Sequence, residues 1–234
     1  MKFLYLAIDL FSVIIPLAFS FHPKINFYKK WRSFFIANCL VAFLFIIWDI
    51  LFTKLGVWGF NPDYIMGLYF FNLPIEEVLF FICIPFSCVF TYYCLNLFTS
   101  IKWKSLTGNI FIFVLSSFLL VTGLIFYKRI YTSVTFTSLA FVLLFLQFIL
   151  KVNWLGKFFT IYPVLLIPFF IVNGILTGSG IRQPVVWYNN NENTGIRLFT
   201  IPVEDIFYGL ELILLTVLFY EYFNSKSRHP ETIT

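Results

Sequence analysis

The stretch FNLPIEEVLFF, residues 71–81, places two adjacent glutamates at the start of a run apolar enough to cross a membrane. A second stretch, FTIPVEDIFYG at residues 199–209, repeats this pattern with a Glu–Asp pair. A charged side chain in the middle of a bilayer costs about 3 kcal/mol, so such residues usually face the protein interior or a wet cavity and often mark function. The two stretches therefore guide the search for both the fold and the site.

The composition indicates an integral membrane protein. Of 234 residues, 60% are hydrophobic and 12% are charged, and the mean hydropathy is +0.90, whereas soluble domains have about 25% charged residues. Crossing the hydrocarbon core takes about 20 apolar residues in a helix. We expect an all-α polytopic membrane protein with seven transmembrane helices, at residues 4–21, 34–53, 74–95, 109–127, 131–150, 160–177 and 201–223.

An internal repeat becomes visible on counting from Pro74 and Pro202. In both halves an Asn lies 13 residues before the proline, a Gly 7 before and a Phe 3 before, and a Trp opens the block with a spacing that slips by one. The acidic pair and then an aromatic residue follow each proline. The matched pairs are Trp58 and Trp187, Asn61 and Asn189, Gly67 and Gly195, Phe71 and Phe199, Glu76 and Glu204, Glu77 and Asp205, and Phe80 and Tyr208.

The repeat unit is three helices. We expect residues 1–98 to form the first repeat, residues 99–129 a connector with the fourth helix, and residues 130–234 the second repeat with a cytoplasmic tail. Corresponding helices are four apart, so the two repeats should insert in the same direction. Parallel repeats predict a pseudo-twofold axis along the membrane normal and a site shared between the halves.

The basic residues set the expected orientation, because cytoplasmic loops carry an excess of Lys and Arg. Of the 16 basic residues, 10 lie after the first, third and fifth helices and in the tail: Lys24, Lys29, Lys30, Arg32, Lys102, Lys104, Lys151, Lys157, Lys226 and Arg228. This predicts an outside N-terminus and a cytoplasmic C-terminus, in the bacterial cell membrane. The net charge of +5 indicates contact with anionic membrane lipids, and nothing suggests a nucleic-acid partner.

Seven carboxylates within or beside the predicted spans are the candidates for a site: Asp9, Asp49, Glu76, Glu77, Glu204, Asp205 and Glu211. Adjacent helix positions differ by about 100°, so the members of each pair cannot point the same way. One should face a cavity while the other contacts a neighbouring helix. Glu204, Tyr208 and Glu211 share a face by their spacing, as do Glu76 and Phe80.

A purely structural interpretation explains part of this pattern. Proline followed by acids is an ordinary helix start, because the fixed φ of proline and the helix dipole both favour it, and Asn72 or Thr200 could act as the cap. It accounts for one acid per helix. It does not account for two in both repeats with Asp49 beside them.

Acid–base chemistry suits such a cluster. An apolar environment disfavours the carboxylate anion, and paired carboxyls disfavour double ionisation, so a protonated acid can lie beside an ionised base. The 34 Phe, 13 Tyr and 6 Trp residues offer aromatic faces that attract positive charge. The sequence has no dinucleotide-binding or P-loop motif, and its two histidines lie outside the predicted spans. We therefore expect no cofactor, no metal site and a redox-neutral reaction through a carbocation.

At these residues the chain resembles the small membrane lycopene cyclases. The resemblance rests on DILFTKLGVWGFNPDYIMGLYFFNLPIEEVLFF at residues 49–81 and VVWYNNNENTGIRLFTIPVEDIFYGLELILL at residues 185–215. That family includes two-subunit enzymes of Gram-positive carotenoid producers and a fused domain in fungal bifunctional carotenoid enzymes. Each half of this chain is similar to one subunit, so the whole is similar to the fused form. Asn173 stands near the place in the second half that Asp49 takes in the first, which implies that the halves are not equivalent.

The resemblance implies cofactor-independent cyclisation of the linear ψ end groups of lycopene to β-ionone rings. It implies Glu76 and Glu204 as acid or base, Glu77 and Asp205 as their partners, and Asp49 as a support. The expected substrate contacts are Trp58, Asn61, Phe80, Trp187, Asn189, Tyr208 and Glu211. The expected partners are the lipophilic carotenoid, membrane lipids and other enzymes of carotenoid biosynthesis.

Two alternatives stay open. One is a cyclase of elongated C50 carotenoids, because the sequence does not distinguish the length of the substrate. The other is a proton-coupled transporter, since intramembrane acids and parallel repeats occur there too. A retinal photoreceptor would need a lysine in the last helix, and residues 201–223 contain none.

Overall fold

The computed structural model describes residues 1–98 and 105–228. Of the expected connector and tail, residues 99–104, with Lys102 and Lys104, and residues 229–234 lie outside the described part. Within it, seven α-helices follow one another: α1 (Leu4–Phe19), α2 (Trp31–Lys54), α3 (Ile75–Phe98), α4 (Ser105–Ile125), α5 (Ile130–Leu144), α6 (Leu155–Leu176) and α7 (Val203–Arg228). The all-α polytopic architecture is confirmed.

The helix lengths agree with a membrane-spanning chain. In the described residues, six helical segments are long and apolar enough to cross a membrane, and α1 is a shorter apolar helix of 16 residues. A 3₁₀ turn, η1 (Phe27–Lys30), leads into α2, and a π-helical turn, η3 (Phe145–Ile149), extends α5. The predicted spans agree with the observed helices to within a few residues.

Short strands, which the sequence reading did not predict, precede the two acidic helices. In the first half these are β1 (Trp58–Phe60), β2 (Tyr69–Phe70) and β3 (Leu73–Pro74), with a 3₁₀ turn, η2 (Pro62–Tyr64), after β1. In the second half they are β4 (Val186–Tyr188), β5 (Arg197–Leu198) and β6 (Ile201–Pro202). β1 pairs with β4, β2 with β3 and β5 with β6.

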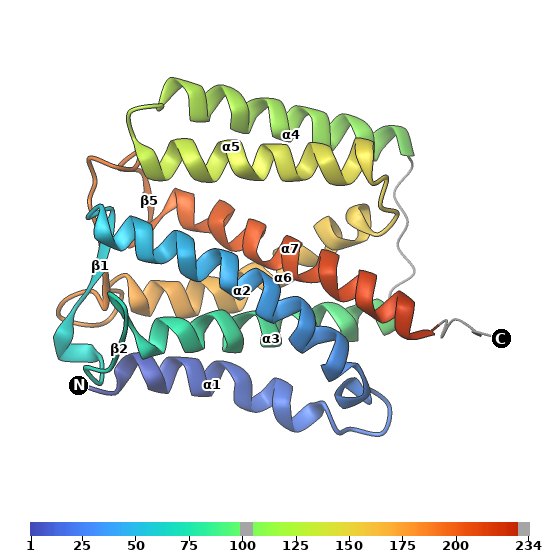
Figure 1. The fold of residues 1–234 in the computed structure, drawn as a ribbon, viewed down its shortest axis with the longest axis horizontal. Helices are drawn as coiled ribbons and strands as arrows, with labels where there is room; N and C mark the ends of the chain where they lie inside the picture. Colours follow the sequence, from blue (N-terminus) through green and yellow to red (C-terminus); the bar gives the residue numbers. More distant parts are fainter. Residues whose placement is uncertain (99–104, 229–234) are drawn as a thin grey trace. The chain divides into compact units, whose positions relative to one another are not determined.

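The order of elements is the same in both halves: two helices, a single strand, a two-stranded hairpin and the acidic helix (Figure 1). The registers of the two hairpins also match. Tyr69 pairs with Pro74 in the first, and Arg197 pairs with Pro202 in the second. The chain is therefore built from two three-helix repeats, and α4 is the helix between them.

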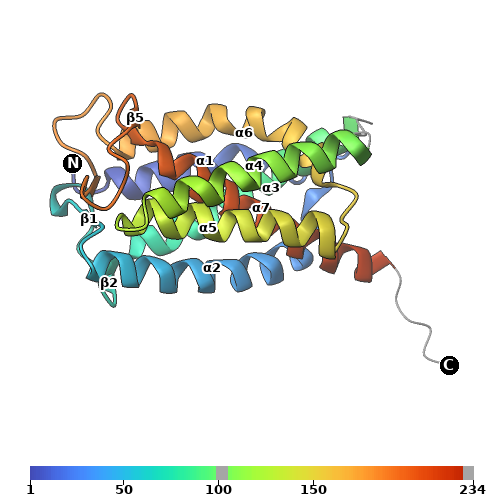
Figure 2. The same cartoon turned by 90° about the horizontal axis from the view of Figure 1, so that it is seen from above.

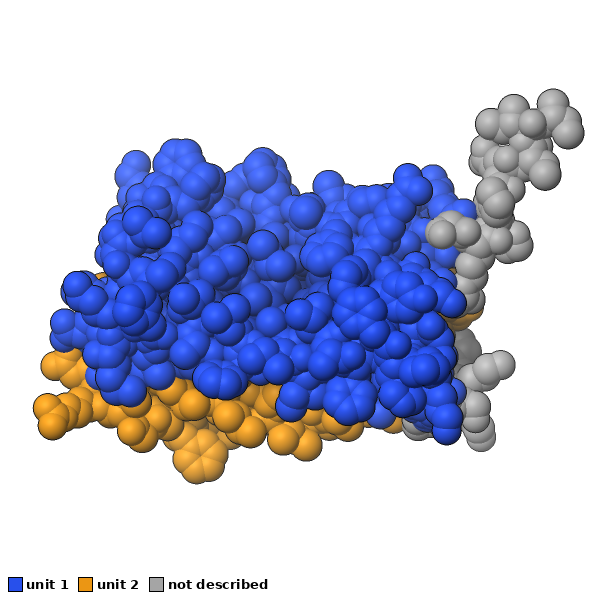
Figure 3. All heavy atoms as spheres, turned by 90° about the horizontal axis from the view of Figure 1, so that it is seen from below, with its two compact units in different colours: residues 1–55, 60–98, 212–234 blue, residues 56–59, 99–211 orange. Residues whose placement is uncertain are grey.

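By contacts the chain divides into two compact units (Figure 3), whose boundaries differ from those of the repeats. The first unit contains residues 1–55, 60–98 and 212–234, and the second contains residues 56–59 and 99–211. The division runs through α7, after Glu211. It also assigns Trp58, from the first repeat, to the second unit.

In the first unit, α1 and α2 both pack against α3. The end of this unit that includes η1 is filled by rings around Phe27, which is fully buried. Its ring lies 5.7 Å from that of Phe86 and 5.6 Å from that of Phe90. In the second unit, α4 lies alongside α5 (Figures 1 and 2).

Candidate functional site

A tight hairpin leads into each acidic helix. Its first turn needs a residue with positive φ, which Gly67 (φ 87°) and Gly195 (φ 77°) adopt without strain. Phe71 (φ 55°) and Phe199 (φ 57°) also lie in the left-handed region, where a non-glycine residue is uncommon. The two hairpins thus share backbone conformations as well as strand register.

Asn61 and Asn189, which match between the repeats, each stabilise a turn that lies before the hairpin. Oδ1 of Asn61 accepts a hydrogen bond of 3.0 Å from the backbone N–H of Asp63. Oδ1 of Asn189 accepts one of 3.0 Å from the backbone N–H of Asn191. These bonds explain the repeated asparagine by local structure, and a contact with substrate stays a prediction for both residues.

The first acid of each pair is fully buried and held by its own hairpin. Oε1 of Glu76 accepts a hydrogen bond of 2.6 Å from the backbone N–H of Met66. Oε1 of Glu204 accepts one of 2.7 Å from the backbone N–H of Thr194 and one of 2.6 Å from the hydroxyl of Thr132. The other oxygen, Oε2, has no hydrogen-bond partner among the described residues in either glutamate.

The second acid of each pair bonds to tyrosine. The hydroxyl of Tyr5, on α1, donates to Oε2 of Glu77 at 2.5 Å. The hydroxyl of Tyr131, at the start of α5, donates to Oδ1 of Asp205 at 2.6 Å, and that of Tyr188, in β4, donates to Oδ2 at 2.9 Å. The adjacent acids therefore bond to different parts of each unit.

The two residues expected as helix caps bond elsewhere. Asn72 bonds to Ile50. Thr200 bonds to Thr177, Ser179 and Gly174.

The first unit gathers further acids around this pair. Asp9, on α1, is fully buried and interacts electrostatically with Glu76 and Glu77. Asp49, on α2, is 2% exposed and interacts with Tyr5. Three helices of one unit thus bring carboxyl groups near the Tyr5 hydroxyl.

The second unit has a third acid of its own. Glu211, on α7, is buried, and its Oε2 accepts a hydrogen bond of 2.7 Å from the hydroxyl of Ser138 on α5. Helical spacing places it on the same face as Glu204 and Tyr208.

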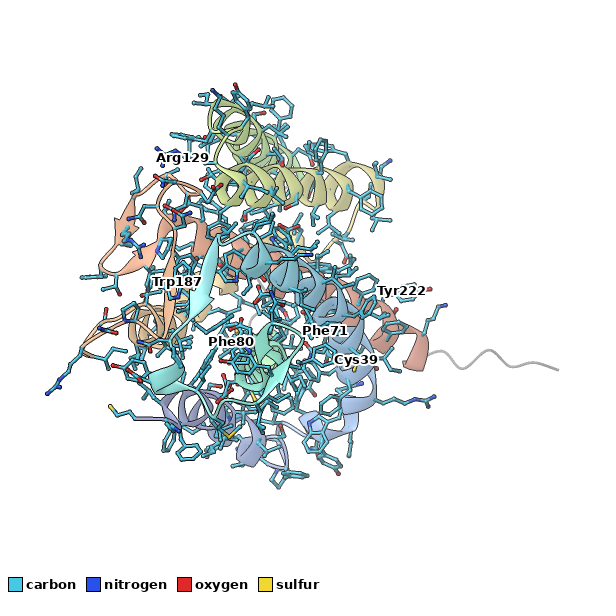
Figure 4. All side chains as sticks on the ribbon, turned by 60° about the vertical axis from the view of Figure 1, so that its left-hand side comes forward. Cys39, Phe71, Phe80, Arg129, Trp187 and Tyr222 are labelled. Carbon is cyan, nitrogen blue, oxygen red and sulfur yellow. The ribbon has the colours of Figure 1, made fainter. Side chains whose placement is uncertain are left out.

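Aromatic rings surround Asp205 in the second unit. The ring of Trp58 lies 5.0 Å from that of Tyr131 and 6.1 Å from those of Tyr188 and Tyr208. In the first unit, Phe80, on α3, lies 6.3 Å from Tyr5 in an edge-to-face arrangement (Figure 4).

The two repeated tryptophans differ in their surroundings. Trp58 is 5% exposed, whereas Trp187 is 45% exposed. Figure 4 labels Trp187, which belongs to β4. An added methyl group at Gly59 would overlap the ring of Trp187. The Trp58 ring therefore belongs to the surroundings of the second acid pair, and the Trp187 ring lies over the backbone of β1.

The hydroxyl groups that bond to the acids are absent from the predicted site. They belong to Tyr5, Thr132, Tyr131, Ser138 and Tyr188. A signal was present in the sequence, because Tyr5 and Tyr131 are 126 residues apart, as are Ser12 and Ser138. Extending the repeat alignment from α3 and α7 to α1 and α5 would have found three of the five, Tyr5, Tyr131 and Ser138.

This arrangement suits proton transfer. A buried carboxyl with one oxygen held by an amide keeps the other in a fixed direction, and proton transfer requires such placement. Among the residues that the structure describes, no group of three or more His, Cys, Asp and Glu side chains is arranged to hold a metal ion.

Comparison with known proteins identifies the family. The chain matches no curated protein and no solved structure. The model of the family described as lycopene cyclase matches residues 2–95 and 128–223, which include both hairpins and both acid pairs. These regions form most of the chain and correspond to its two repeats. The family acts in carotenoid biosynthesis, and its substrate is a lipophilic carotenoid. The chain belongs to the lycopene cyclase family and is an integral membrane protein.

Proposed function

We propose that this chain cyclises the linear ψ end groups of lycopene to β-ionone rings by acid–base catalysis without a cofactor. The observation that supports this most strongly is the matched state of Glu76 and Glu204. Each is fully buried, has one oxygen bonded to a hairpin amide and has a second oxygen without a hydrogen-bond partner in the described residues. Such an oxygen can carry a proton to a substrate that offers no polar group.

The reaction balances without an external reagent. A carboxylic acid protonates C2 of the terminal C1=C2 bond, which leaves a cation at C1. The electrons of the C5=C6 bond then form the C1–C6 bond and move the cation to C5. A base removes the proton from C6, and its electrons restore the C5=C6 bond. One proton enters and one leaves, so no oxidant or reductant is required.

The proposal gives each predicted catalytic residue a role. Glu76 and Glu204 donate the proton, and Glu77 and Asp205 are their partners, held by tyrosine hydroxyls. Asp49 supports the first pair.

Aromatic rings would stabilise the cation. The faces of Trp and Tyr attract positive charge, with a benefit of about 2 kcal/mol in a desolvated site. Trp58 and Tyr208 take this role beside Asp205, and Phe80 takes it in the first unit.

We place the protein in the cell membrane with its N-terminus outside, on the distribution of basic residues. The C-terminus would then lie in the cytoplasm. Accessibility of single cysteines introduced at each end to a membrane-impermeant reagent would test this orientation, and labelling of the C-terminus alone in intact cells would contradict it.

Pigment analysis of lycopene-accumulating bacterial cells that express the chain tests the function. We expect monocyclic or bicyclic carotene with β rings. Glu76→Gln and Glu204→Gln should lower its formation at least about 100-fold, the smaller end of the range for general acid catalysis. Glu77→Gln is the matched control, because its amide oxygen can still accept the Tyr5 hydrogen bond, and it should lower the yield less.

The outcomes separate the competing functions. Persistent lycopene with confirmed membrane expression contradicts the proposal and calls for an elongated C50 carotenoid as substrate. If that too is unchanged, a proton-coupled transporter becomes the better reading. Normal cyclisation in both glutamine variants would overturn the assignment of the acids.

A further inference from the structure

Asp9 is a buried acid that the proposed mechanism does not use. It is fully buried in α1, and neither side-chain oxygen has a hydrogen-bond partner within residues 1–98 and 105–228. A buried carboxyl without partners costs several kcal/mol. Asp9 also interacts electrostatically with Glu76 and Glu77, so this unsatisfied group adjoins the proposed acid.

The repeat alignment gives Asp9 a counterpart without a carboxyl group. The hydroxyl of Ser12 bonds to the carbonyl oxygen of Asp9 at 2.7 Å, and that of Ser138 bonds to the carbonyl oxygen of Thr135 at 3.2 Å. Asp9 and Thr135 are 126 residues apart, as are the serines. Thr135 therefore stands in α5 where Asp9 stands in α1.

On the helices that carry the acid pairs, α3 and α7, it is the second repeat that has the additional carboxyl group. Glu211 in α7 lies 128 residues after Cys83 in α3, the offset that relates Glu76 to Glu204. Apart from Asp49 on α2, the first repeat thus has its third carboxyl on its first helix and a thiol on its last helix. The second repeat has a threonine hydroxyl and a carboxyl in these places.

These two positions adjoin each other in both units. In the second unit, the hydroxyl of Ser138 contacts both the carbonyl oxygen of Thr135 and the carboxylate of Glu211. In the first unit, Asp9 interacts electrostatically with Cys83. The Ser87 hydroxyl there lies 2.9 Å from the carbonyl oxygen of Cys83 and 2.8 Å from that of Ser12. A carboxyl group on either helix would therefore reach the same region between the two helices.

We infer that Asp9 and Glu211 are equivalent groups supplied by opposite helices, and that each accepts the proton released from C6 in its own half. This inference rests on the proposed cyclase function. The acid gives its proton to C2, the third carboxyl receives the proton from C6, and the new C5=C6 bond neutralises the cation. The proton then returns from the third carboxyl to the glutamate, which restores both groups for the next cycle.

This role makes a specific prediction about the product. Ring type depends on which proton the C5 cation loses: loss from C6 gives a β ring, from C4 an ε ring and from the C5 methyl group a γ ring. Loss of the acid leaves linear lycopene. Loss of the base instead leaves a cation that must lose a different proton, so the few rings that still form should include ε or γ types.

A pair of matched variants tests the inference, and both contain Glu211→Gln. The removal variant adds Asp9→Asn, which removes the inferred proton acceptor from both halves. The relocation variant adds Asp9→Thr and Cys83→Glu, which gives the first half the arrangement of the second. Chromatography of pigments from lycopene-accumulating cells measures yield and ring type, and gel filtration in detergent reports folding.

The removal variant should form at least about 100-fold less β ring than the unsubstituted chain, with ε or γ rings in the remainder. The relocation variant should form at least about tenfold more β ring than the removal variant, and the β ring should again be its ring type. Unchanged yield and ring type in the removal variant would overturn the inference, as would a folded relocation variant without recovery. If the removal variant does not fold, the relocation variant decides alone. Absence of cyclic product from the unsubstituted chain would instead refute the proposed function.

Discussion

The backbone N–H of Met66 lies 2.6 Å from Oε1 of Glu76, and this bond ties the first acid to the hairpin that precedes its helix. The second repeat makes the same bond at 2.7 Å, from Thr194 to Glu204. In each case ten residues separate donor and acceptor. The hairpin therefore positions the side chain to which we assign proton donation, and changes to its turn should be felt at the acid.

Gly67→Ala tests the connection between hairpin and acid. Gly67 follows Met66 and has a φ of 87°, with open space where a Cβ would lie. Gly67→Ala should lose about 1 kcal/mol of stability, because alanine is strained at this φ. It should also cyclise less substrate, because the Met66 amide shifts. Gly174→Ala is the control, because this helical residue has room for a methyl group. It should keep both the stability and the cyclisation of the unsubstituted chain. Equal activity of Gly67→Ala and the unsubstituted chain would show that the hairpin does not position Glu76.

The tyrosine partners of the acids should contribute to stability and turnover. Tyr5→Phe removes a hydroxyl bonded to Glu77, and Tyr131→Phe removes a hydroxyl bonded to Asp205. A hydrogen bond to a charged group contributes about 2 kcal/mol. We expect each variant to lower thermal stability in detergent, and turnover. Unchanged stability and turnover in both variants would contradict this role.

Trp58 and Trp187 should also differ. Trp58→Ala removes a buried ring that packs against three tyrosines and should cost about 3 kcal/mol of stability together with most of the cyclisation. Trp187→Ala removes a ring that is 45% exposed and should cost less of both. Thermal unfolding in detergent and pigment yield measure the two effects. Equal losses would indicate that Trp187 has a role in the reaction.

Phe199→Gly should stabilise the second hairpin. Phe199 has a φ of 57° and its side chain is 88% exposed, so its backbone strain is not offset by burial in the protein. A left-handed non-glycine residue costs about 1 kcal/mol, and glycine removes that cost. A higher unfolding temperature in detergent is the expected result. A lower one would show that the exposed ring contributes to stability, for example by contact with lipid.

Much of the fold could be predicted from local sequence. Apolar length located the helices, and the repeat around Pro74 and Pro202 corresponds to two hairpins whose strand pairing and turn conformations match. The strands themselves were not predicted, because two-residue pairings such as β2 with β3 give no alternating pattern. The difference in exposure between Trp58 and Trp187 also could not be predicted, since it depends on a pairing of β1 with β4 across more than 120 residues of sequence.

The sequence points to the buried acids but not to their hydroxyl partners. Carboxylates stand out in an apolar helix because burying them is costly, and Glu76, Glu77, Glu204 and Asp205 are all buried. Tyrosine is common in this chain, with 13 residues, so Tyr5 and Tyr131 stand out only when the repeat alignment is extended to α1 and α5. Their hydrogen bonds to the acids depend on packing between helices, and the sequence of one helix does not show that packing.

The most direct test of proton-driven cyclisation is a single-turnover reaction in D₂O. The purified chain is reconstituted in liposomes equilibrated in D₂O, in excess over lycopene and without any added cofactor, and the product is examined by mass spectrometry. The account predicts cyclic carotene that has gained deuterium at C2 of the ring, and no such product with Glu76→Gln and Glu204→Gln combined. Cyclic product without deuterium, or product formed only when a redox cofactor is added, would contradict it.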